Sequence, residues 1–433
     1  MFKRLAFLCL ILSAHFAGAQ DITFNKDIAP IIHRSCTPCH RPGEAAPFSL
    51  ITYQDVAKRA SFIKDVVVSG YMPPWKPDPH YTTFANERKL SDAEVDRIKK
   101  WVDQKAPEGK GPAPKTPAFI AGTQYPRKPD LTLTIDQAYE VKGDNLERFI
   151  VFKIPFELGD SMNVEALEFV SNNKQTIHHA NFAIHPVEES IDIKTPAPFI
   201  NLTEDDRTKY DQYLPFKKKM TYYGGWIPGT TYESYPKDMG WIMPKRGVVL
   251  LTIHYAPIAK DEKNVASINL FFKKTPVKRE VKVISIGSGG IGEKDIQPMF
   301  YIPANQVKTF KVKVTTPMMD QSLLYVWPHM HVLGKSFKAY AVTPAGDTIK
   351  LVNIPDWDFR WQEIYRFKTL VKIPEKSVLT VEGTYDNTAG NPNNPSSPPK
   401  MVFSAGDMKT TDEMLTLLMV FLPYQPGDEA REL

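Results

Sequence analysis

The sequence predicts a multidomain chain in which a small all-α region precedes a larger all-β module. Apolar residues recur at helical spacing before residue 108, and short β-type runs separated by Pro, Gly and Asn turns follow residue 131. The intervening stretch, residues 109–130, is rich in Pro, Gly and Lys and is typical of a linker. The 433 residues allow two to four domains at roughly 100–200 residues each.

The N-terminus predicts a secretory signal peptide over residues 1–19. A basic start precedes an apolar run, and Ala17, Gly18 and Ala19 supply the small residues of a cleavage site. The run is too short for a stable membrane span, and no later stretch is long and apolar enough to cross a bilayer. We therefore expect an exported protein, periplasmic or secreted, without a membrane span.

The charge balance and the cysteine count exclude several classes of protein. The formal net charge is +5 without a dense basic patch, so no nucleic-acid partner is predicted. Cys9 lies inside the predicted signal peptide, which leaves only Cys36 and Cys39. Two cysteines separated by two residues do not make a disulfide scaffold in an exported protein of this size.

These two cysteines belong to the sequence Cys-Thr-Pro-Cys-His at residues 36–40, which predicts covalent attachment of haem. Both thiols can add to haem vinyl groups, and His40 then lies beneath the iron as an axial ligand. A zinc site would need a second ligand pair, and no other cysteine follows. A redox dithiol would need a βαβ context, which the pattern lacks.

The flanks of this motif resemble a small cytochrome c domain, here residues 21–108. Helical spacing precedes the motif, and a second helix, capped by Ser91, follows it. The resemblance makes Met72 the sixth iron ligand, since a thioether raises the haem potential, and His80 is the alternative. The apolar residues of the two helices are Phe24, Ile28, Ile31, Ile32, Val95, Ile98, Trp101 and Val102.

Five of the ten histidines fall in three short motifs of the β-type region. One histidine alone is better explained as a hydrogen-bonded core or surface residue, but three motifs in a chain otherwise poor in histidine favour metal binding. Imidazole suits zinc, copper, iron and nickel. The motifs are "TIHHA" with His178 and His179, "LLTIHYAP" with His254, and "WPHMHVLGK" with His329 and His331.

The adjacent pair His178 and His179 raises a geometric question, because neighbouring side chains of a strand point to opposite faces. Both rings can reach one metal only if the strand ends or bulges at the pair. The alternative is that one ring binds the metal while the other packs behind it. By contrast, His329 and His331 are two residues apart and share a face.

The order HH, HY, HxHxxGK and TDEM resembles the type II copper, ascorbate-dependent monooxygenases, such as the peptidylglycine α-hydroxylating and dopamine β-monooxygenases. The resemblance covers roughly residues 140–425. It implies two jelly-roll-like β domains, residues 131–288 and 289–433, each holding one copper. Carried over, the ligands of the electron-transfer copper are His178, His179 and His254. Those of the oxygen-activating, catalytic copper are His329, His331 and Met414.

This resemblance implies an oxidoreductase with haem c and two copper ions, which hydroxylates a C–H bond of a small-molecule or peptide substrate with O2. Electrons would come through the fused haem, from ascorbate or another reductant, or from an electron-donor protein. One alternative is a non-catalytic periplasmic electron-transfer or copper-binding protein. Another is a zinc-binding β-sandwich fused to a cytochrome, against which a thioether ligand argues.

The substrate pocket departs from the family. Trp327 stands where peptidylglycine enzymes have the arginine that holds the substrate carboxylate, and Thr252, Thr416 and Leu418 replace a glutamine, an asparagine and a tyrosine. Without that arginine, no bidentate ion pair can clamp a carboxylate there. We therefore predict poor activity on glycine-extended peptides and a preference for less charged or apolar substrates.

Overall fold

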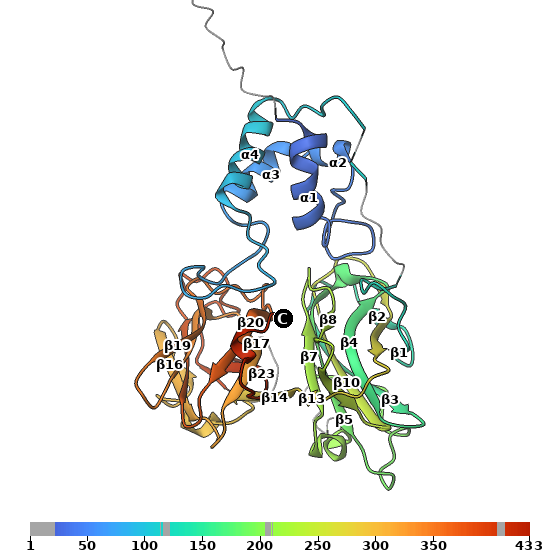
Figure 1. The fold of residues 1–433 in the computed structure, drawn as a ribbon, viewed down its shortest axis with the longest axis vertical. Coiled ribbons are helices and arrows are strands. Elements are labelled where there is room, and N and C mark those ends of the chain that lie inside the picture. Colours follow the sequence, from blue (N-terminus) through green and yellow to red (C-terminus); the bar gives the residue numbers. More distant parts are fainter. Residues whose placement is uncertain (1–21, 113, 116–121, 204–208, 210, 405–411) are drawn as a thin grey trace, which may run out of the picture.

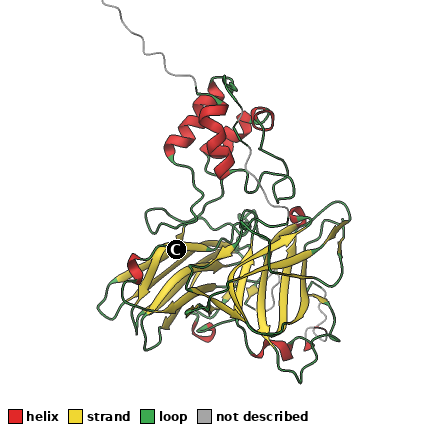
Figure 2. Cartoon of the chain, turned by 45° about the vertical axis from the view of Figure 1, so that its right-hand side comes forward, coloured by secondary structure: helices red, strands yellow, loops and turns green. Residues whose placement is uncertain are grey.

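A computed structural model describes residues 22–433, except 113, 116–121, 204–208, 210 and 405–411. The expected signal peptide lies outside these described residues. A small helical region sits above two β sandwiches that lie side by side (Figure 1), and the strands of both sandwiches dominate the chain (Figure 2). The mostly β architecture is as expected. Within the described residues, no helix has the length and apolar character needed to cross a membrane.

The helical region, residues 22–108, packs around a small apolar core. Ser91 and Glu94 form a reciprocal capping box that starts its last helix, as the sequence predicts. Trp101 in that helix is fully buried and packs 6.1 Å from Phe24. The elements are η1 (Phe24–Ile28), α1 (Ala29–Ser35), α2 (Tyr53–Ala57), α3 (Ala60–Val68) and α4 (Asp92–Asp103).

The first sandwich consists of two main sheets around a shared apolar core. One sheet contains β1 (Leu131–Thr134), β12 (Ala266–Phe272), β4 (Met162–Ser171), β9 (Met239–Met243), β13 (Arg279–Glu280) and β8 (Glu233–Ser234). The other contains β6 (Phe199–Asn201), β3 (Arg148–Glu157), β10 (Arg246–Tyr255), β5 (Ile177–Pro186) and β7 (Tyr222–Trp226). A small additional sheet pairs β2 (Tyr139–Val141) with β11 (Glu262–Asn264). Short 3-10 turns are η2 (Lys174–Thr176) and η3 (Leu214–Lys218).

The second sandwich has the same two-layer construction around its own core. One sheet contains β14 (Lys282–Gly287), β23 (Thr416–Pro423), β17 (Gln321–His329) and β20 (Tyr365–Ile373). The other contains β16 (Val307–Thr315), β21 (Val378–Asp386), β18 (Gly334–Val342) and β19 (Thr348–Ile354). A small sheet pairs β15 (Tyr301–Ile302) with β22 (Val402–Phe403), and the 3-10 turns are η4 (Glu293–Asp295) and η5 (Asp428–Ala430).

The division between the sandwiches differs from the expected boundary at residues 288 and 289. All of β14 pairs with β23, from Lys282 with Phe421 to Gly287 with Thr416, so β14 belongs to the second sandwich. The apolar alternation of β14 fits either sandwich, and only its hydrogen-bonding partner decides. The sandwiches also pack directly together, because Leu324, Leu370 and Leu422 of the second join the core of the first.

The helical region contacts both sandwiches. On the first, the Glu44 carboxylate pairs with Lys174 of η2 at 2.9 Å, and the Gln175 side chain donates to the Ala46 carbonyl at 3.2 Å. On the second, Phe84 is buried in the apolar core and forms a β-bridge with Phe367. The stretch that follows Met72 is therefore part of the folded core of the second sandwich as well as of the helical region. We call residues 71–88 the docking segment.

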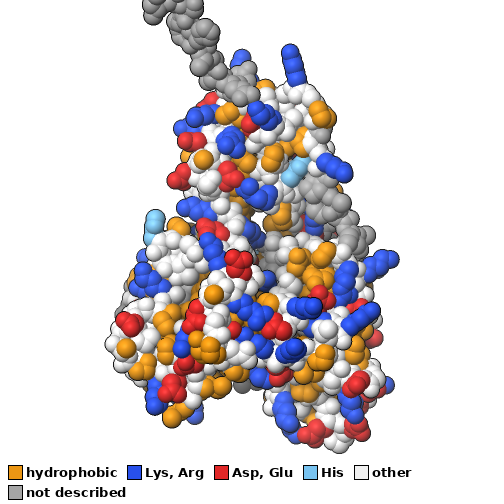
Figure 3. All heavy atoms as spheres, viewed as in Figure 1, with side chains coloured by type: hydrophobic (Ala, Val, Ile, Leu, Met, Phe, Trp, Pro, Cys, Tyr) orange, Lys and Arg blue, Asp and Glu red, His pale blue; other side chains and the backbone are white. Residues whose placement is uncertain are grey.

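In the view of Figure 3, acidic and basic side chains are interspersed over the helical region and both sandwiches, so charges of one sign do not dominate this face. The linker also follows the surface of the first sandwich at its C-terminal end. There Thr123 and the backbone of Gln124 both donate to the buried Glu168 carboxylate of β4.

Candidate metal centres

A β-bulge turns His178 and His179 toward the same site. In the pairing of β10 with β5, His254 lies opposite His179, but the next residue, Tyr255, lies opposite Ile177. His178 is thus the extra residue of a bulge, which bends the strand and re-aims its side chain. The condition that the strand ends or bulges at the histidine pair is therefore met. Ligand atoms of His178, His179 and His254 all lie within 4.8 Å of one another.

The electrostatics of this group suit neutral metal ligands. His254 is 1 % exposed, and neither of its ring nitrogens has a hydrogen-bond partner. A buried imidazole without partners is costly, and a bound cation would satisfy it. Burial, together with the neighbouring His254, lowers the pKa of His178 to about 3. Glu147 approaches from the solvent side, with a carboxylate oxygen 3.4 Å from His254 Nε2.

The second group lies at the end of β17. The rings of His329 and His331 are 5.1 Å apart between centroids and nearly perpendicular, and both are buried. The Asp412 carbonyl lies 2.8 Å from His331 Nδ1, which leaves Nε2 as the ring atom for a ligand bond. Burial lowers the pKa of His329 to about 3, so this ring is also neutral near pH 7.

Met414 lies two residues before β23, the strand that pairs with β17. Thr416 of β23 lies opposite His329, and continuing that antiparallel register places Met414 across from His331. Glu413 fixes this approach, because its carboxylate accepts the backbone N–H groups of His331 at 2.9 Å and Leu333 at 2.7 Å. Met414 itself is 7 % exposed. Sequence reasoning missed Glu413, whose only signal is its position immediately before the predicted ligand.

The two groups adjoin, although their residues come from different sandwiches. The ring centroids of His179 and His329 are only 6.4 Å apart. Packing of the sandwiches produces this closeness: the Tyr235 and Tyr325 hydroxyls lie 3.1 Å apart, and the Trp327 indole lies against Gly225. A Cβ at Gly225 would come within 2.0 Å of the indole, so glycine is needed for this contact.

Trp327 is buried in this interface at 5 % exposure. Its indole N–H donates to the Gln362 carbonyl at 2.9 Å, and its ring packs 5.8 Å from Tyr223. The side chain is therefore held between the two sandwiches by contacts on both sides.

The haem motif follows directly on α1. The His40 N–H donates to the Cys36 carbonyl at 2.9 Å, which continues the helical turn through the motif. The Phe48 carbonyl lies 3.1 Å from His40 Nδ1, so this nitrogen donates and Nε2 remains for an axial bond. Cys36 and Cys39 are unpaired thiols, and burial raises the pKa of Cys36 to about 12. A thiol so hard to deprotonate is a poor nucleophile in itself.

Met72 and His80, the two candidates for the sixth ligand, lie in different surroundings. Met72 lines a cavity of about 330 Å³ in the helical region, together with Val67, Leu90 and Val95. His80 is exposed, and its backbone N–H donates to the Asp78 carboxylate. Ser69, Lys89 and Asp92 also line the cavity, so its wall is mixed in polarity.

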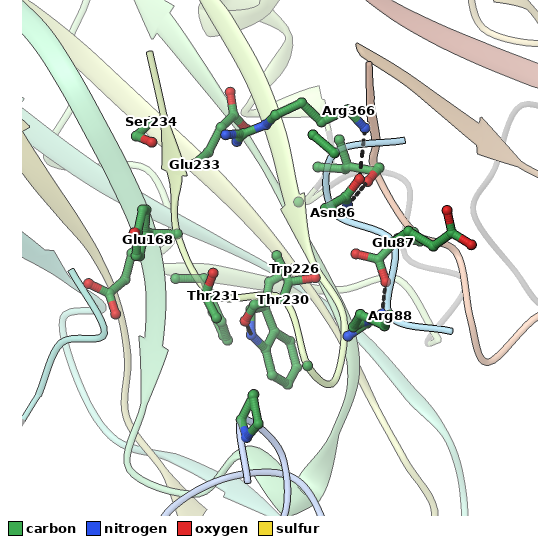
Figure 4. Close-up of a pocket in the computed structure, with 18 of the residues that line it drawn as sticks. Asn86, Glu87, Arg88, Glu168, Trp226, Thr230, Thr231, Glu233, Ser234 and Arg366 are labelled. Atoms are coloured by element: carbon green, nitrogen blue, oxygen red, sulfur yellow. Dashed lines mark hydrogen bonds and ion pairs between the residues drawn. The ribbon is translucent and has the colours of Figure 1, made fainter. Parts of the chain in front are cut away.

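A second cavity, of about 490 Å³, lies where the helical region meets both sandwiches (Figure 4). Ser35 reaches it from the end of α1 and Pro38 from the motif at residues 36–40. Trp226 and Gly229 reach it from β7 and its turn, and Glu363 from the second sandwich. None of the five candidate histidines lines it. The cavity therefore lies between the helical region and the two sandwiches, and none of the candidate metal or haem ligands lines it.

Comparisons with known proteins identify no family. No family model and no curated protein matches the sequence. Solved structures with some likeness include a capsid structure of infectious bursal disease virus, Gx strain, at 12 % identity, with 70 % of this chain and 74 % of that chain covered and a TM-score of 0.17. Another is an oxalate decarboxylase of Bacillus subtilis at 9 % identity, with 73 % and 87 % covered and a TM-score of 0.14. Scores this low carry no argument about fold family or function.

Proposed function

We propose that the chain is an exported monooxygenase that holds two copper ions between its sandwiches and a covalent haem in its helical region. The observation that carries the proposal is the bulge at His178, which gathers three imidazoles beside the His329 and His331 pair. Such a set of nitrogen donors with a thioether suits copper better than zinc. In this proposal the sandwiches are the jelly-roll-like domains, and the helical region is a cytochrome c domain.

The donor sets fit the two cofactors. His178, His179 and His254 would hold one copper, and His329, His331 and Met414 the other, while Cys36, Cys39 and His40 would bind haem with Met72 as sixth ligand. When bound, copper would supply one-electron and oxygen chemistry, and haem c would supply electrons. The protein contributes neutral imidazoles, the Asp412 carbonyl that orients His331, and the Glu413 carboxylate that ties Met414 to the histidine turn.

The first test is the metal content of the full-length protein. Two copper ions and one covalent haem per chain are expected by elemental analysis and by the pyridine haemochrome spectrum of denatured protein. His254→Ala should bind one copper, and the matched control is His185→Ala. His185 is a buried histidine of β5, the strand that carries His178 and His179, and it is bonded to the Lys219 carbonyl and lies outside the cluster. Copper at wild-type level in His254→Ala would contradict the proposal, as would zinc in place of copper.

The second test is turnover. Reductant-dependent O2 uptake should yield a hydroxylated product, sought by comparing spent medium of cells with and without the gene. The second candidate is a copper-binding electron-transfer protein, which the buried Trp327 favours, because it fills the position of the substrate-holding arginine. That candidate predicts two coppers and reversible redox changes without product. The product assay therefore distinguishes a monooxygenase from an electron-transfer protein.

A further inference from the structure

The loop between β19 and β20, residues 355–364, carries an aromatic ring across the histidine cluster. The Phe359 ring stacks on His178 at 5.0 Å between centroids with an interplanar angle of 29°. The same ring is 5.8 Å from His179, 5.9 Å from His254 and 5.8 Å from His331. Phe359 is half-buried, so it lies between the imidazoles and the outside of the protein. We call residues 355–364 the cover loop.

The cover loop is bound to the second histidine group on its inner side. The Trp357 indole N–H donates to the His331 carbonyl at 3.3 Å. At the far end of the loop, the Gln362 carbonyl accepts from Trp327, two residues before His329. Hydrogen bonds on both sides of Phe359 in the sequence therefore hold it in place, in addition to the packing of its own ring.

The outer side of the cover loop is bound by the docking segment of the helical region. Lys76 pairs with the Asp356 carboxylate at 2.8 Å, and the Tyr71 hydroxyl lies 3.4 Å from the Arg360 guanidinium. Beyond the loop centre, Arg88 forms an ion pair with Glu363, and both are largely buried. Asn86 continues the contact, donating to the Ile364 carbonyl at 2.7 Å and accepting from the Arg366 N–H at 3.0 Å.

We propose that Phe359 is a positioning residue that covers the histidine centre, and that the helical region holds it there. The proposal rests on the proposed function, since it assumes a metal at these histidines. A phenyl ring offers no hydrogen bond, so hydrated anions and water are disfavoured on that side, whereas small apolar molecules are not. The cover would select uncharged, apolar substrates. It would also couple access to the metal with docking of the haem-binding region, because the docking segment begins beside Met72.

Azide is a suitable probe of the cover, because it is a small hydrated anion that binds exposed Cu(II). Azide titrations of copper-loaded, full-length protein would follow the azide-to-copper absorption band and the EPR spectrum. Phe359→Ala should bind azide about tenfold more tightly than wild type, which is about 1.4 kcal/mol. Phe359→Leu, which keeps an apolar side chain, should give an intermediate value. The matched control is Phe403→Ala on β22, whose ring is 56 % exposed.

Tyr71→Phe tests the docking part of the proposal, because it removes only the hydroxyl that reaches Arg360. Like Phe359→Ala, it should tighten azide binding, but by a smaller factor, and the copper content should not change. If both Phe359 variants bind two coppers and still bind azide with wild-type affinity, that result would overturn the proposal that Phe359 covers the centre, but it would leave the proposed function unaffected. A wild-type protein that binds no copper would overturn both. If Phe359→Ala loses copper, the azide affinity of Phe359→Leu decides whether Phe359 covers the histidine centre.

Discussion

The two candidate cofactor sites are built in opposite ways. The haem motif is five consecutive residues at the end of one short helix, where His40 is oriented by the nearby Phe48 carbonyl. The histidine centre instead needs a bulge in β5, the end of β10 and the end of β17, from two different sandwiches. A local motif keeps its geometry when distant packing changes, whereas a centre between sandwiches depends on that packing. The two sites should therefore respond differently to the same perturbation.

The largest expected effect comes from replacing Cys36 and Cys39 with alanine. No haem should then remain attached after denaturation, because both thioether bonds are gone. The copper content should stay at two per chain, because neither cysteine contributes to the histidine centre. Pyridine haemochrome spectra and elemental analysis measure the two quantities. Haem that extracts freely into acid–acetone from the wild type would refute the haem assignment, and loss of copper in the variant would show that the two sites are not independent.

The next effect concerns electron flow between the two sites. The turn after β7 brings the haem motif close to the first sandwich: a Cβ at Gly229 would lie 2.8 Å from Cys39 Sγ. β7 in turn pairs with β5, which carries the histidine pair. We expect haem reoxidation, followed by anaerobic stopped flow with reduced haem and oxidised copper, to be first order and independent of protein concentration. It should be lost in His254→Ala. A rate that rises with concentration would mean that the haem serves an outside partner.

The third effect in size should be a difference in kcat/KM between charged and uncharged substrates. Trp327 cannot clamp a carboxylate, so kcat/KM for a glycine-extended peptide should be at least about tenfold below that for an uncharged analogue of equal size, as expected for one missing charged hydrogen bond. Purified enzyme and paired peptides that differ only in a terminal carboxylate or amide make the comparison. Efficient peptide hydroxylation would point to another cation, such as Lys335, which is exposed and pairs with Asp386 at 3.4 Å.

Met414→Ala should separate the oxidation states of copper. A thioether favours the reduced ion, so the variant should lose affinity for Cu(I) more than for Cu(II). Competition titrations with a chelator specific for each oxidation state measure both constants. Met419→Ala of β23 is a useful control, because Met419 is fully buried in the core of the second sandwich. Equal weakening of both oxidation states by Met414→Ala would show that Met414 is a core residue.

The geometry of the Cys36 to His40 motif could be predicted from the sequence more completely than that of the histidine centre, for physical reasons. Periodicity was enough for the helical region and the mostly β module, because burial on one face dictates apolar spacing in both. The Cys36 to His40 motif is contiguous, so its geometry follows from one helical turn. The bulge at His178 could only be stated as a condition, because it depends on the register between two strands. The 6.4 Å approach of His179 to His329 depends on sandwich packing, which leaves no periodic signal.

The smallest expected effect tests whether docking of the helical region on the first sandwich speeds electron transfer. Lys174 immediately precedes the histidine strand and pairs with Glu44, four residues after His40, and both side chains are nearly buried. Lys174→Met keeps the length and apolar body of the side chain but removes the ion pair. Glu44 keeps Arg41 at 3.0 Å, so its carboxylate is not left uncompensated and the fold should persist.

In Lys174→Met, the contact between residues 44–46 and η2 should loosen, because the bond from Gln175 to Ala46 at 3.2 Å and that from Gln124 to Glu44 at 3.1 Å then remain at this corner. Haem reoxidation should slow several-fold while remaining first order. The control is Lys64→Met, which removes an exposed ion pair with Asp103 inside the helical region, away from both sandwiches. A wild-type rate in Lys174→Met would mean that electrons do not depend on this corner. The contacts of the docking segment with the second sandwich would then be the place to look for the route.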